Sequence, residues 1–338
     1  MTQIPFWTVT CSKWITVENL LLLSGCGKMV KGGKNRDPAR NLAWLTFTPF
    51  LLYKFGSITQ KTGGQPCRFF SLYTPIKDQL LIPDSSLIQL AQLSHYGFII
   101  CLLIAAALSL FPERKGSLIF LIAAVCLCLP FFGIRAWLKQ FFPFTDKTES
   151  FVTLALMISV CAGWYYRKLT RQEFSILILM SALWSTTALV FKTEIRFPTP
   201  YLRTIWYPLH VPLSFASYAL WFIAGIGSLP RRRPTPARLS DLDAAAFRST
   251  LCRNGFIFFT LSMIFGGIWG YLAWGAYFLW DPKVVWSVIV WFFYGNLLHL
   301  DKLPRFKKWK DPLFILGILI ILITFVGTGF FTRSIHRF

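Results

Sequence analysis

The chain has 338 residues, of which 55% are apolar and 17% aromatic, and only 14% are charged. With a mean hydropathy of +0.53, this composition excludes an ordinary soluble enzyme and is typical of a polytopic membrane protein. The formal net charge is +21. Because the basic residues lie in short loops between apolar segments, this charge indicates topology signals and anionic headgroups, and no nucleic-acid partner is expected.

Residues 1–94 form an N-terminal extension that is basic at first and polar toward its end. Within it, 41–56 is apolar but short for a membrane span and contains Pro49. We treat 41–56 as a candidate additional span, because a crossing there would place the preceding basic residues inside. No role is assigned to the rest of the extension.

From His95 onward, apolar segments recur at about the 17–25 residues that a helix needs to cross a bilayer. Eight spans are predicted: 95–111, 117–138, 150–166, 174–191, 209–229, 255–273, 284–300 and 312–331. We therefore expect an all-α fold, a polytopic transmembrane helix bundle, over residues 95–338.

The loops between these spans alternate between the two sides of the membrane. One set carries 16 Lys and Arg: 112–116, 167–173, 230–254 and 301–311. The other set carries 9: 135–149, 192–208, 274–283 and 332–338. The side richer in Lys and Arg is predicted to be cytoplasmic, so the loop at 274–283 faces the periplasm or an equivalent lumen.

The Trp-rich loop, Trp274 to Trp286, reads WGAYFLWDPKVVW and connects two predicted spans. An interfacial aromatic belt would also be rich in Trp and Tyr. Here the aromatic residues are concentrated at one connection, which favours a flat aromatic shelf for a flat ligand. Gly275 permits close approach of the backbone, and Pro282 fixes the turn into the next helix.

Three of the four histidines are placed informatively by the predicted spans. His210 begins one span and His336 follows the last, so both are expected on the side of the Trp-rich loop. His299 lies about 24 Å of helix rise from Lys283, at the other membrane face, so it belongs to a separate site. A single interfacial histidine carries no functional message, but two imidazoles beside an aromatic shelf suit a six-coordinate haem iron.

A haem bound in this way would also need cations or donors for its propionates. Lys283, Arg333 and Arg337 are expected on the same side of the membrane as the two histidines. Simple solvation is the favoured explanation of each of these three charges when it is taken alone.

At these residues the chain resembles the CcsA/ResC family, the haem-handling membrane subunit of the system II cytochrome c synthase. The family's loop, WGxYWxWDPKxxW, is matched by Trp274, Gly275, Tyr277, Trp280, Asp281, Pro282, Lys283 and Trp286. A family helix that opens with His-Val and continues to Ser-Tyr-Ala is matched by His210, Val211 and Ser217-Tyr218-Ala219. The family's later histidines are matched by His299 and His336, and an HFPLSNLYES-like stretch is matched loosely at Phe142–Phe144 and Glu149-Ser150. The chain departs from the family at Phe278, where Trp is usual, and at Val284, where Glu is usual.

The resemblance implies that haem b is both substrate and bound ligand. It implies His210 and His336 as axial ligands, Asp281 at the same reacting centre, and His299 at a separate iron-binding entry site. The remaining implied haem contacts are Trp274, Gly275, Tyr277, Trp280, Lys283 and Trp286. The implied fold is a haem-handling domain over 95–338 with the loop 274–286 outside the membrane.

The activity implied by the resemblance is that of a cytochrome c haem lyase, or synthase. Haem would be moved to the outer face and presented to the CxxCH segment of apocytochrome c, whose thiols form thioethers with it. The implied partners are a CcsB/ResB-type membrane subunit, apocytochrome c and a thiol-reducing thioredoxin-like protein. The implied location is the bacterial inner membrane with the loop in the periplasm, or the thylakoid membrane.

Two other functions stay open at this point. A haem transporter or haem chaperone of the CcmC/CcmF type would use a similar loop without ligation activity. A solute permease with an interfacial Trp loop is less favoured, because the predicted spans contain no carboxylate for ion coupling.

Overall fold

The computed structural model describes residues 85–111, 115–191, 194–230 and 241–328, which all belong to the unit Thr74–Phe338. None of these residues lies in a β-strand. The candidate span 41–56 and three residues of interest near the C-terminus, Arg333, His336 and Arg337, lie outside the described residues.

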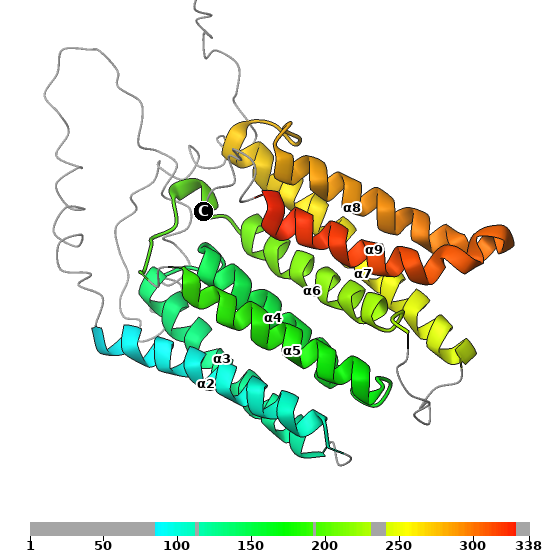
Figure 1. The fold of residues 1–338 in the computed structure, drawn as a ribbon. Coiled ribbons are helices and arrows are strands. Elements are labelled where there is room, and N and C mark those ends of the chain that lie inside the picture. The colour runs from blue at the N-terminus through cyan, green and yellow to red at the C-terminus, as the bar shows by residue number, and fades with distance from the viewer. Residues whose placement is uncertain (1–84, 112–114, 192–193, 231–240, 329–338) are drawn as a thin grey trace, which may run out of the picture. The chain divides into compact units, whose positions relative to one another are not determined.

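Eight α-helices form most of the described chain, as Figure 1 shows. They are α2 (Ser85–Ser109), α3 (Lys115–Lys139), α4 (Lys147–Trp164), α5 (Arg171–Thr187), α6 (Trp206–Ile226), α7 (Asp241–Trp274), α8 (Pro282–His299) and α9 (Lys310–Leu322). Short 3₁₀ turns occur at Ala188–Val190, Pro200–Leu202, Leu300–Lys302 and Pro304–Trp309, and a π-helical turn, Ile323–Gly327, extends α9. Each predicted span overlaps one of these helices, so the predicted all-α bundle is confirmed.

Two helices begin ten or more residues before their predicted spans. α2 begins at Ser85, ten residues before the predicted start at His95, and α7 begins at Asp241, inside the predicted loop 230–254. α7 has 34 residues, or about 51 Å of rise, which exceeds a hydrocarbon core of about 30 Å. The prediction was wrong here because hydropathy detects only the apolar part of a helix, whereas helical backbone continues through polar residues beyond it.

Six of the eight helices are long and apolar enough to cross a membrane: α2, α3, α6, α7, α5 together with the turn Ala188–Val190, and α9 together with the turn Ile323–Gly327. α4 and α8 have 18 residues each, and each has a lysine in its first turn. The chain is therefore a multi-pass membrane protein.

Side-chain caps set where several helices begin. Glu149 accepts hydrogen bonds from the backbone N–H groups of Thr145 and Asp146 at the start of α4. Thr170 and Glu173 cap the start of α5 reciprocally, with Glu173 accepting from the backbone of Thr170 at 2.8 Å. Such capping boxes satisfy the backbone donors that a helix N-terminus leaves without intrahelical partners.

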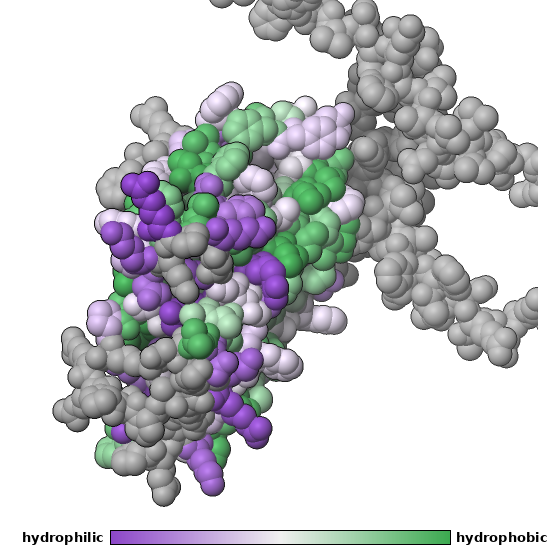
Figure 2. All heavy atoms as spheres, turned by 90° about the vertical axis from the view of Figure 1, so that its right-hand side faces the viewer, coloured by the Kyte–Doolittle hydropathy of each residue, from purple (hydrophilic) through white to green (hydrophobic). Residues whose placement is uncertain are grey.

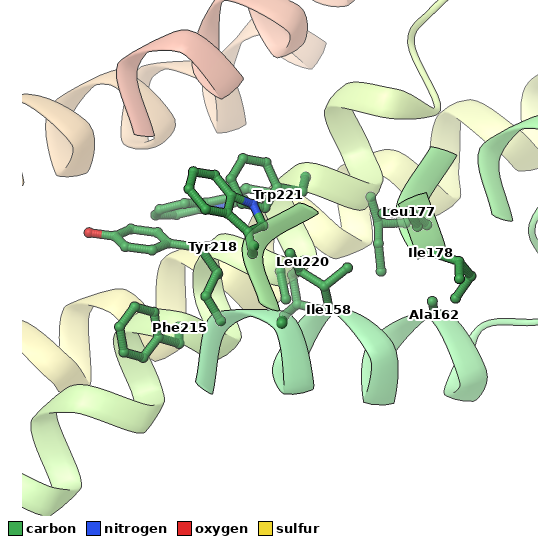
Figure 3. Packing of buried hydrophobic residues seen from close by; sticks show 14 of the residues in the cluster. Ile158, Ala162, Leu177, Ile178, Phe215, Tyr218, Leu220 and Trp221 are labelled. Carbon is green, nitrogen blue, oxygen red and sulfur yellow. The ribbon is translucent and has the colours of Figure 1, made fainter. Parts of the chain in front are cut away.

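α6 is the central helix of the bundle. It packs against α4 and α5 on one side and against α7 and α9 on the other, while α2 and α3 pair at the edge next to α5 (Figure 1). Ile158 of α4, Leu177 of α5 and Leu220 and Trp221 of α6 belong to one buried apolar cluster (Figure 3). Of the candidate spans, α6 has the largest buried share, 61%. A side chain on α6 is therefore held by neighbours on most sides.

Small residues and short polar bonds bring the helices close together. The Ser117 hydroxyl of α3 donates to the Ala105 carbonyl of α2 at 2.6 Å. Ser159 of α4 and Ser181 of α5 share a 2.7 Å hydrogen bond. These contacts are typical of membrane bundles, where apolar burial drives association weakly and close packing contributes more.

Figure 2 looks onto the end of the bundle where α2, α4, α6 and α8 finish. Hydrophilic side chains gather on this end, and apolar side chains continue along the sides that lead away from it. The basic segments that were predicted to be cytoplasmic, 167–173 and 301–311, are at this end. These two described segments of the set richer in Lys and Arg therefore lie at the same end of the bundle.

Candidate functional site

A cavity of about 280 Å³ lies at the opposite end of the bundle from the one in Figure 2. Its walls come from the N-terminal turns of α4, α6 and α8, the C-terminal part of α7, the Trp-rich loop, and the π-helical turn after α9. Small-molecule sites typically enclose about 300–1,000 Å³ and have mainly apolar walls with a few polar groups. Aromatic side chains dominate here, including Phe144, Phe215, Tyr218, Trp269, Trp274 and Phe325.

The π-helical turn is a local departure from regular helix at the cavity wall. Thr324 and Phe325, in the turn Ile323–Gly327, both line the cavity. Phe325 also packs edge-on against Phe215 of α6, with ring centroids 5.4 Å apart. π turns inside α-helices occur often at functional sites, because they change the direction in which side chains point.

His210 lines the cavity from the second turn of α6 and is the one described histidine that does so. Its Nδ1 lies 2.8 Å from the backbone carbonyl of Ser262 on α7. A carbonyl only accepts hydrogen bonds, so Nδ1 carries a proton, and in the neutral imidazole Nε2 then carries the lone pair. Histidines that bind metals are usually fixed in this way, by donating the other ring N–H to a carbonyl or carboxylate.

Gly266 makes room for this histidine. A Cβ added at Gly266 would lie 2.6 Å from Nδ1 of His210 and 2.8 Å from its Cε1. These separations are too short for any side chain, so the imidazole lies directly against the α7 backbone. The orientation of His210 therefore depends on a glycine 56 residues away in the sequence.

The Trp-rich loop contributes some, but not all, of its aromatic side chains to the cavity. Trp274, Tyr277 and Phe278 line the cavity. Trp274 packs against Trp269 with ring centroids 4.7 Å apart, and the Trp269 indole N–H is bonded to the Tyr201 carbonyl at 2.9 Å. The predicted shelf therefore includes Trp269, which lies in α7 before the loop.

Four other loop residues that were predicted to contribute to the site lie outside the described cavity lining: Gly275, Trp280, Asp281 and Trp286. Trp280 is 87% exposed. Gly275 has φ +76° and its N–H is bonded to the Tyr271 carbonyl, which ends α7 in the left-handed conformation that favours glycine. Nothing lies within 4 Å of an added Cβ there, so within the described chain the glycine serves the turn, and close approach to a ligand stays a prediction.

Asp281 has a structural role in the described chain. Its side chain accepts a hydrogen bond from the backbone N–H of Lys283 at 2.9 Å and caps α8, which begins with Pro282. Lys283 itself lines the cavity. That Asp281 takes part in haem attachment stays a prediction.

The described cavity lining contains neither His299 nor His336. His299 is the last residue of α8 and is exposed, whereas the cavity lies at the first two turns of that helix. Its predicted separation from the His210 site thus agrees with the helix. His336 lies outside the described residues, so its proximity to His210 stays a prediction.

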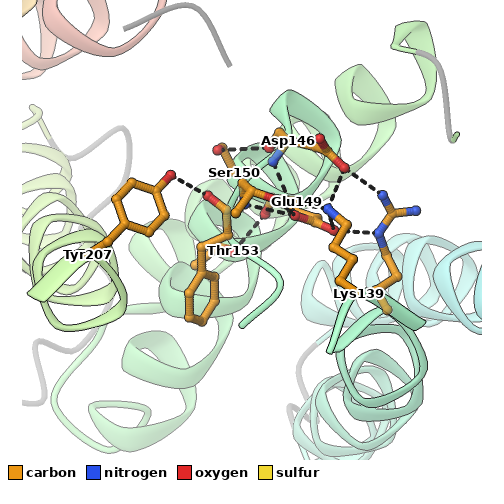
Figure 4. A network of polar contacts seen from close by, with 9 residues as sticks. Lys139, Asp146, Glu149, Ser150, Thr153 and Tyr207 are labelled. Atoms are coloured by element: carbon orange, nitrogen blue, oxygen red, sulfur yellow. Dashed lines mark hydrogen bonds and ion pairs between the residues drawn. The ribbon is translucent and has the colours of Figure 1, made fainter. Parts of the chain in front are cut away.

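A buried cluster of four charged side chains lies beside the cavity (Figure 4). Arg135 of α3 is bonded to Glu149 at 2.6 Å and to Asp146 at 2.9 Å. Lys139, one turn later, is bonded to both of these carboxylates at 2.5 Å. Two cations and two anions balance each other, which offsets part of the large cost of burying them.

The charged cluster is connected to the helix that bears His210. Asp146 lies in the cavity wall together with Phe144. The Tyr207 hydroxyl donates to the Phe144 carbonyl at 2.8 Å, and Tyr207 lies one helical turn before His210 (Figure 4). The loop between α3 and α4 is thus held by ion pairs on one side and by α6 on the other.

The sequence identifies the chain's family. Residues 146–336 match the cytochrome c assembly protein family, which is more than half of the chain. The chain belongs to this family. The expected resemblance to a cytochrome c biogenesis protein is therefore confirmed.

Several curated relatives in the cytochrome c assembly family carry the name cytochrome c biogenesis protein CcsA. The protein from Prochlorococcus marinus strain MIT 9312 is 27% identical over 174 residues, which is 41% of this chain and 55% of the relative. The protein from Chlamydomonas reinhardtii is 27% identical over 151 residues, 41% of this chain and 42% of the relative. The protein from P. marinus strain MIT 9303 is 24% identical over 249 residues, 61% and 78% of the two chains. The chain thus spans about half the length of most of these relatives.

Among solved structures, the fold is similar to that of the cytochrome c heme lyase CcmF. The TM-score is 0.58 and the sequence identity is 16%, and the match covers 81% of this chain and 49% of CcmF. At this identity the similarity shows a shared arrangement of helices and no more.

Several residues that line the cavity could not be predicted from the sequence. Lys147, Ser262, Gly266 and Trp269 all line the cavity, and none was predicted. The charged cluster did leave a signal, because Asp146 and Glu149 have capping-box spacing and Arg135 and Lys139 are four residues apart beside an apolar helix. Both cations had been counted as loop charges, and Glu149 is a carboxylate inside α4 that the predicted spans had excluded.

Proposed function

We propose that this chain is the haem-handling subunit of a cytochrome c synthase, which holds haem b in the cavity and presents it to the CxxCH segment of apocytochrome c. One observation carries the proposal: an imidazole with its Nδ1 bonded to a backbone carbonyl lines an aromatic cavity beside the Trp-rich loop. That tautomer supplies a neutral nitrogen ligand, and aromatic walls suit a porphyrin face. Membership of the cytochrome c assembly family supports the assignment.

The chain's own residues would bind, orient and shield the substrate. Nε2 of His210 would be one axial ligand, and His336 the second. In the attachment step each cysteine thiol adds across a haem vinyl group, so a C–S bond forms and the thiol hydrogen goes to the other vinyl carbon. No group leaves and no oxidant is needed, which is why positioning and exclusion of water are the main contributions expected of the protein.

The remaining contacts and partners belong to the same proposal. Trp274 and Tyr277 would pack on the macrocycle, and Trp280, Trp286 and Gly275 would shape the loop around it. His299 would take part in an entry site at the other end of α8, completed by a CcsB/ResB-type subunit. A thioredoxin-like protein would keep the cytochrome thiols reduced, and the cavity would face the periplasm or the thylakoid lumen.

The first test is the haem absorbance band of the full-length chain purified in detergent. Wild type is expected to carry the band, His210→Ala and His336→Ala to weaken it, and His299→Ala to leave the cavity-bound fraction in place. Because His210 and His299 are at opposite ends of the bundle, they serve as matched substitutions. A colourless wild type that neither retains nor takes up haem would overturn the proposal.

The second test separates ligation from transport. The chain is co-expressed with a CcsB-type partner and an apocytochrome in a host that lacks its own synthase, and covalent haem is detected after denaturing electrophoresis. Covalent product that depends on His210 is expected. Bound haem without covalent product would favour the transporter or chaperone function.

A further inference from the structure

Lysines reach the cavity from two separate helices. Lys147 is the first residue of α4, and Lys283 is the second residue of α8. Both line the cavity, and the only other charged side chain in its described lining is Asp146. The charged side chains in a largely apolar wall are therefore two lysines and one aspartate.

The charge of Asp146 is already balanced. Its carboxylate is bonded to Arg135 at 2.9 Å and to Lys139 at 2.5 Å, both within the charged cluster. It caps the start of α4 as well. Asp146 thus contributes little negative charge to the cavity, although it forms part of the wall.

The two lysines have no equivalent compensation. Among the described residues, neither ammonium group forms an ion pair, and that of Lys147 lies 5.7 Å from the Phe191 ring centroid. Burial lowers the pKa of Lys283, the nearby Asp281 carboxylate raises it, and the Lys147 ammonium group lowers it. Asp281 caps the start of α8 and lies outside the described lining. The cavity therefore combines apolar aromatic walls with two like charges, an arrangement that favours an amphiphilic dianion.

We infer that Lys147 and Lys283 bind the two propionate carboxylates of haem and make the cavity selective for porphyrins that carry two negative charges. This inference rests on the proposed function and assigns a binding role to Lys147. It replaces solvation as the explanation of these two charges, because both lysines line one cavity from different helices.

The test uses porphyrins that lack iron, so that ligation by histidine does not enter the measurement. Protoporphyrin IX and its dimethyl ester are titrated into the full-length chain in detergent, and binding is followed by quenching of Trp fluorescence. The ester keeps the apolar ring and lacks both charges. Wild type is expected to bind the free acid about tenfold or more tightly than the ester.

The variants are Lys147→Met, Lys283→Met and the double substitution. Lys283→Met is expected to weaken binding of the free acid about tenfold, and Lys147→Met, at a more exposed position, about threefold. In the double variant the free acid and the ester should bind equally. Lys147→Arg should bind the free acid as tightly as wild type does, because arginine keeps the positive charge.

Lys168→Met is the matched control. Lys168 lies just beyond the opposite end of α4, and its ammonium group is 5.2 Å from the Phe247 ring centroid, much as that of Lys147 is beside Phe191. It should leave the binding of both porphyrins unchanged. A variant that has lost its fold would bind the ester more weakly as well. Loss of carboxylate binding alone would weaken binding of the free acid and leave binding of the ester unchanged.

The possible results distinguish this inference from the proposed function. The lysine assignment is wrong, and the haem site stands, under two conditions. Wild type binds haem but binds the free acid and the ester equally, and the lysine variants bind the free acid as tightly as wild type. If wild type binds neither haem nor the free acid, both proposals fail together. Equal loss of acid and ester binding in the lysine variants also overturns the assignment.

Discussion

His210 and Ser262 join α6 to α7 at the wall of the cavity by three short polar contacts. The histidine Nδ1 is 2.8 Å from the Ser262 carbonyl and 3.0 Å from its hydroxyl, and that hydroxyl donates to the His210 carbonyl at 2.8 Å. Both the tautomer and the direction of the ring are therefore set by a second helix. The affinity for a ligand held by Nε2 of His210 would therefore change with substitutions in α7 that do not contact that ligand.

Gly266→Ala tests this dependence. The added Cβ would meet His210 at 2.6 Å, so the imidazole must turn away and its bond to Ser262 is lost. Haem affinity is expected to fall about 10–100-fold, the usual cost of disturbing a residue that orients a metal ligand. The fold should stay intact, because alanine is about 1 kcal/mol more favourable than glycine inside a helix.

Gly267→Ala is the control for Gly266→Ala. It is the next residue of α7, and its added Cβ would meet the Tyr277 carbonyl at 3.6 Å, an ordinary contact. Haem titrations and thermal unfolding of both variants in detergent give the comparison. Equal haem affinity in the two variants would contradict the dependence of His210 on α7.

Glu149→Gln tests the charged cluster. The carboxylate is fully buried and compensates Arg135 and Lys139, so its neutralisation leaves an excess positive charge in the interior. The free energy of unfolding is expected to fall by about 3–5 kcal/mol, as when one partner of a buried ion pair is removed. The measurement is thermal or denaturant unfolding of the chain in detergent.

The same substitution at Glu173 is the control. Glu173 forms the equivalent capping box on α5 with Thr170, and glutamine can replace glutamate in that role. Glu173→Gln should therefore change stability by about 0.5 kcal/mol or less. If both variants lose the same stability, capping and not charge compensation explains the effect at Glu149.

The helices could be predicted from the sequence because crossing a bilayer imposes both a length and an apolar composition on each span. The same reasoning failed where that constraint ends. The polar segment of α7 that begins at Asp241 is helical, yet nothing in its hydropathy marks it. Ser85–Ser94 of α2 mixes apolar residues with Ser and Gln, and it was left outside the predicted span although it is helical.

The site could be predicted where a residue type carries its chemistry in a recognisable motif. His210 and the Trp-rich loop meet that condition. Ser262 and Gly266 do not, because their effect on His210 arises only when α6 and α7 pack together. Lys147 likewise gave no signal as a loop cation, since the sequence does not show that α4 and α8 begin at one cavity.

Tyr207→Phe tests the link between the charged cluster and α6. It removes the hydroxyl that donates to the Phe144 carbonyl at 2.8 Å and leaves the buried ring in place (Figure 4). A loss of about 1 kcal/mol of stability is expected from one such bond. Porphyrin affinity should fall a few-fold as well, because Phe144 is in the cavity wall. Tyr201→Phe, an exposed ring for which no hydroxyl bond is described, should change neither quantity.

Gly275→Ala tests the turn that ends α7. Gly275 has φ +76°, a conformation that costs other residues about 1–2 kcal/mol, and an added Cβ would touch nothing within 4 Å. The expected loss of stability is therefore due to the backbone alone, and Gly275→Asn should lose less, because asparagine adopts this conformation more readily.

Gly133→Ala is the control: an added Cβ there also meets open space, but the residue lies inside α3, so alanine should be neutral or stabilising. Unfolding midpoints and limited proteolysis of the Trp-rich loop give the measurement. Equal stability of Gly275→Ala and Gly133→Ala, or equal losses for alanine and asparagine at 275, would show that left-handed backbone is not what position 275 requires.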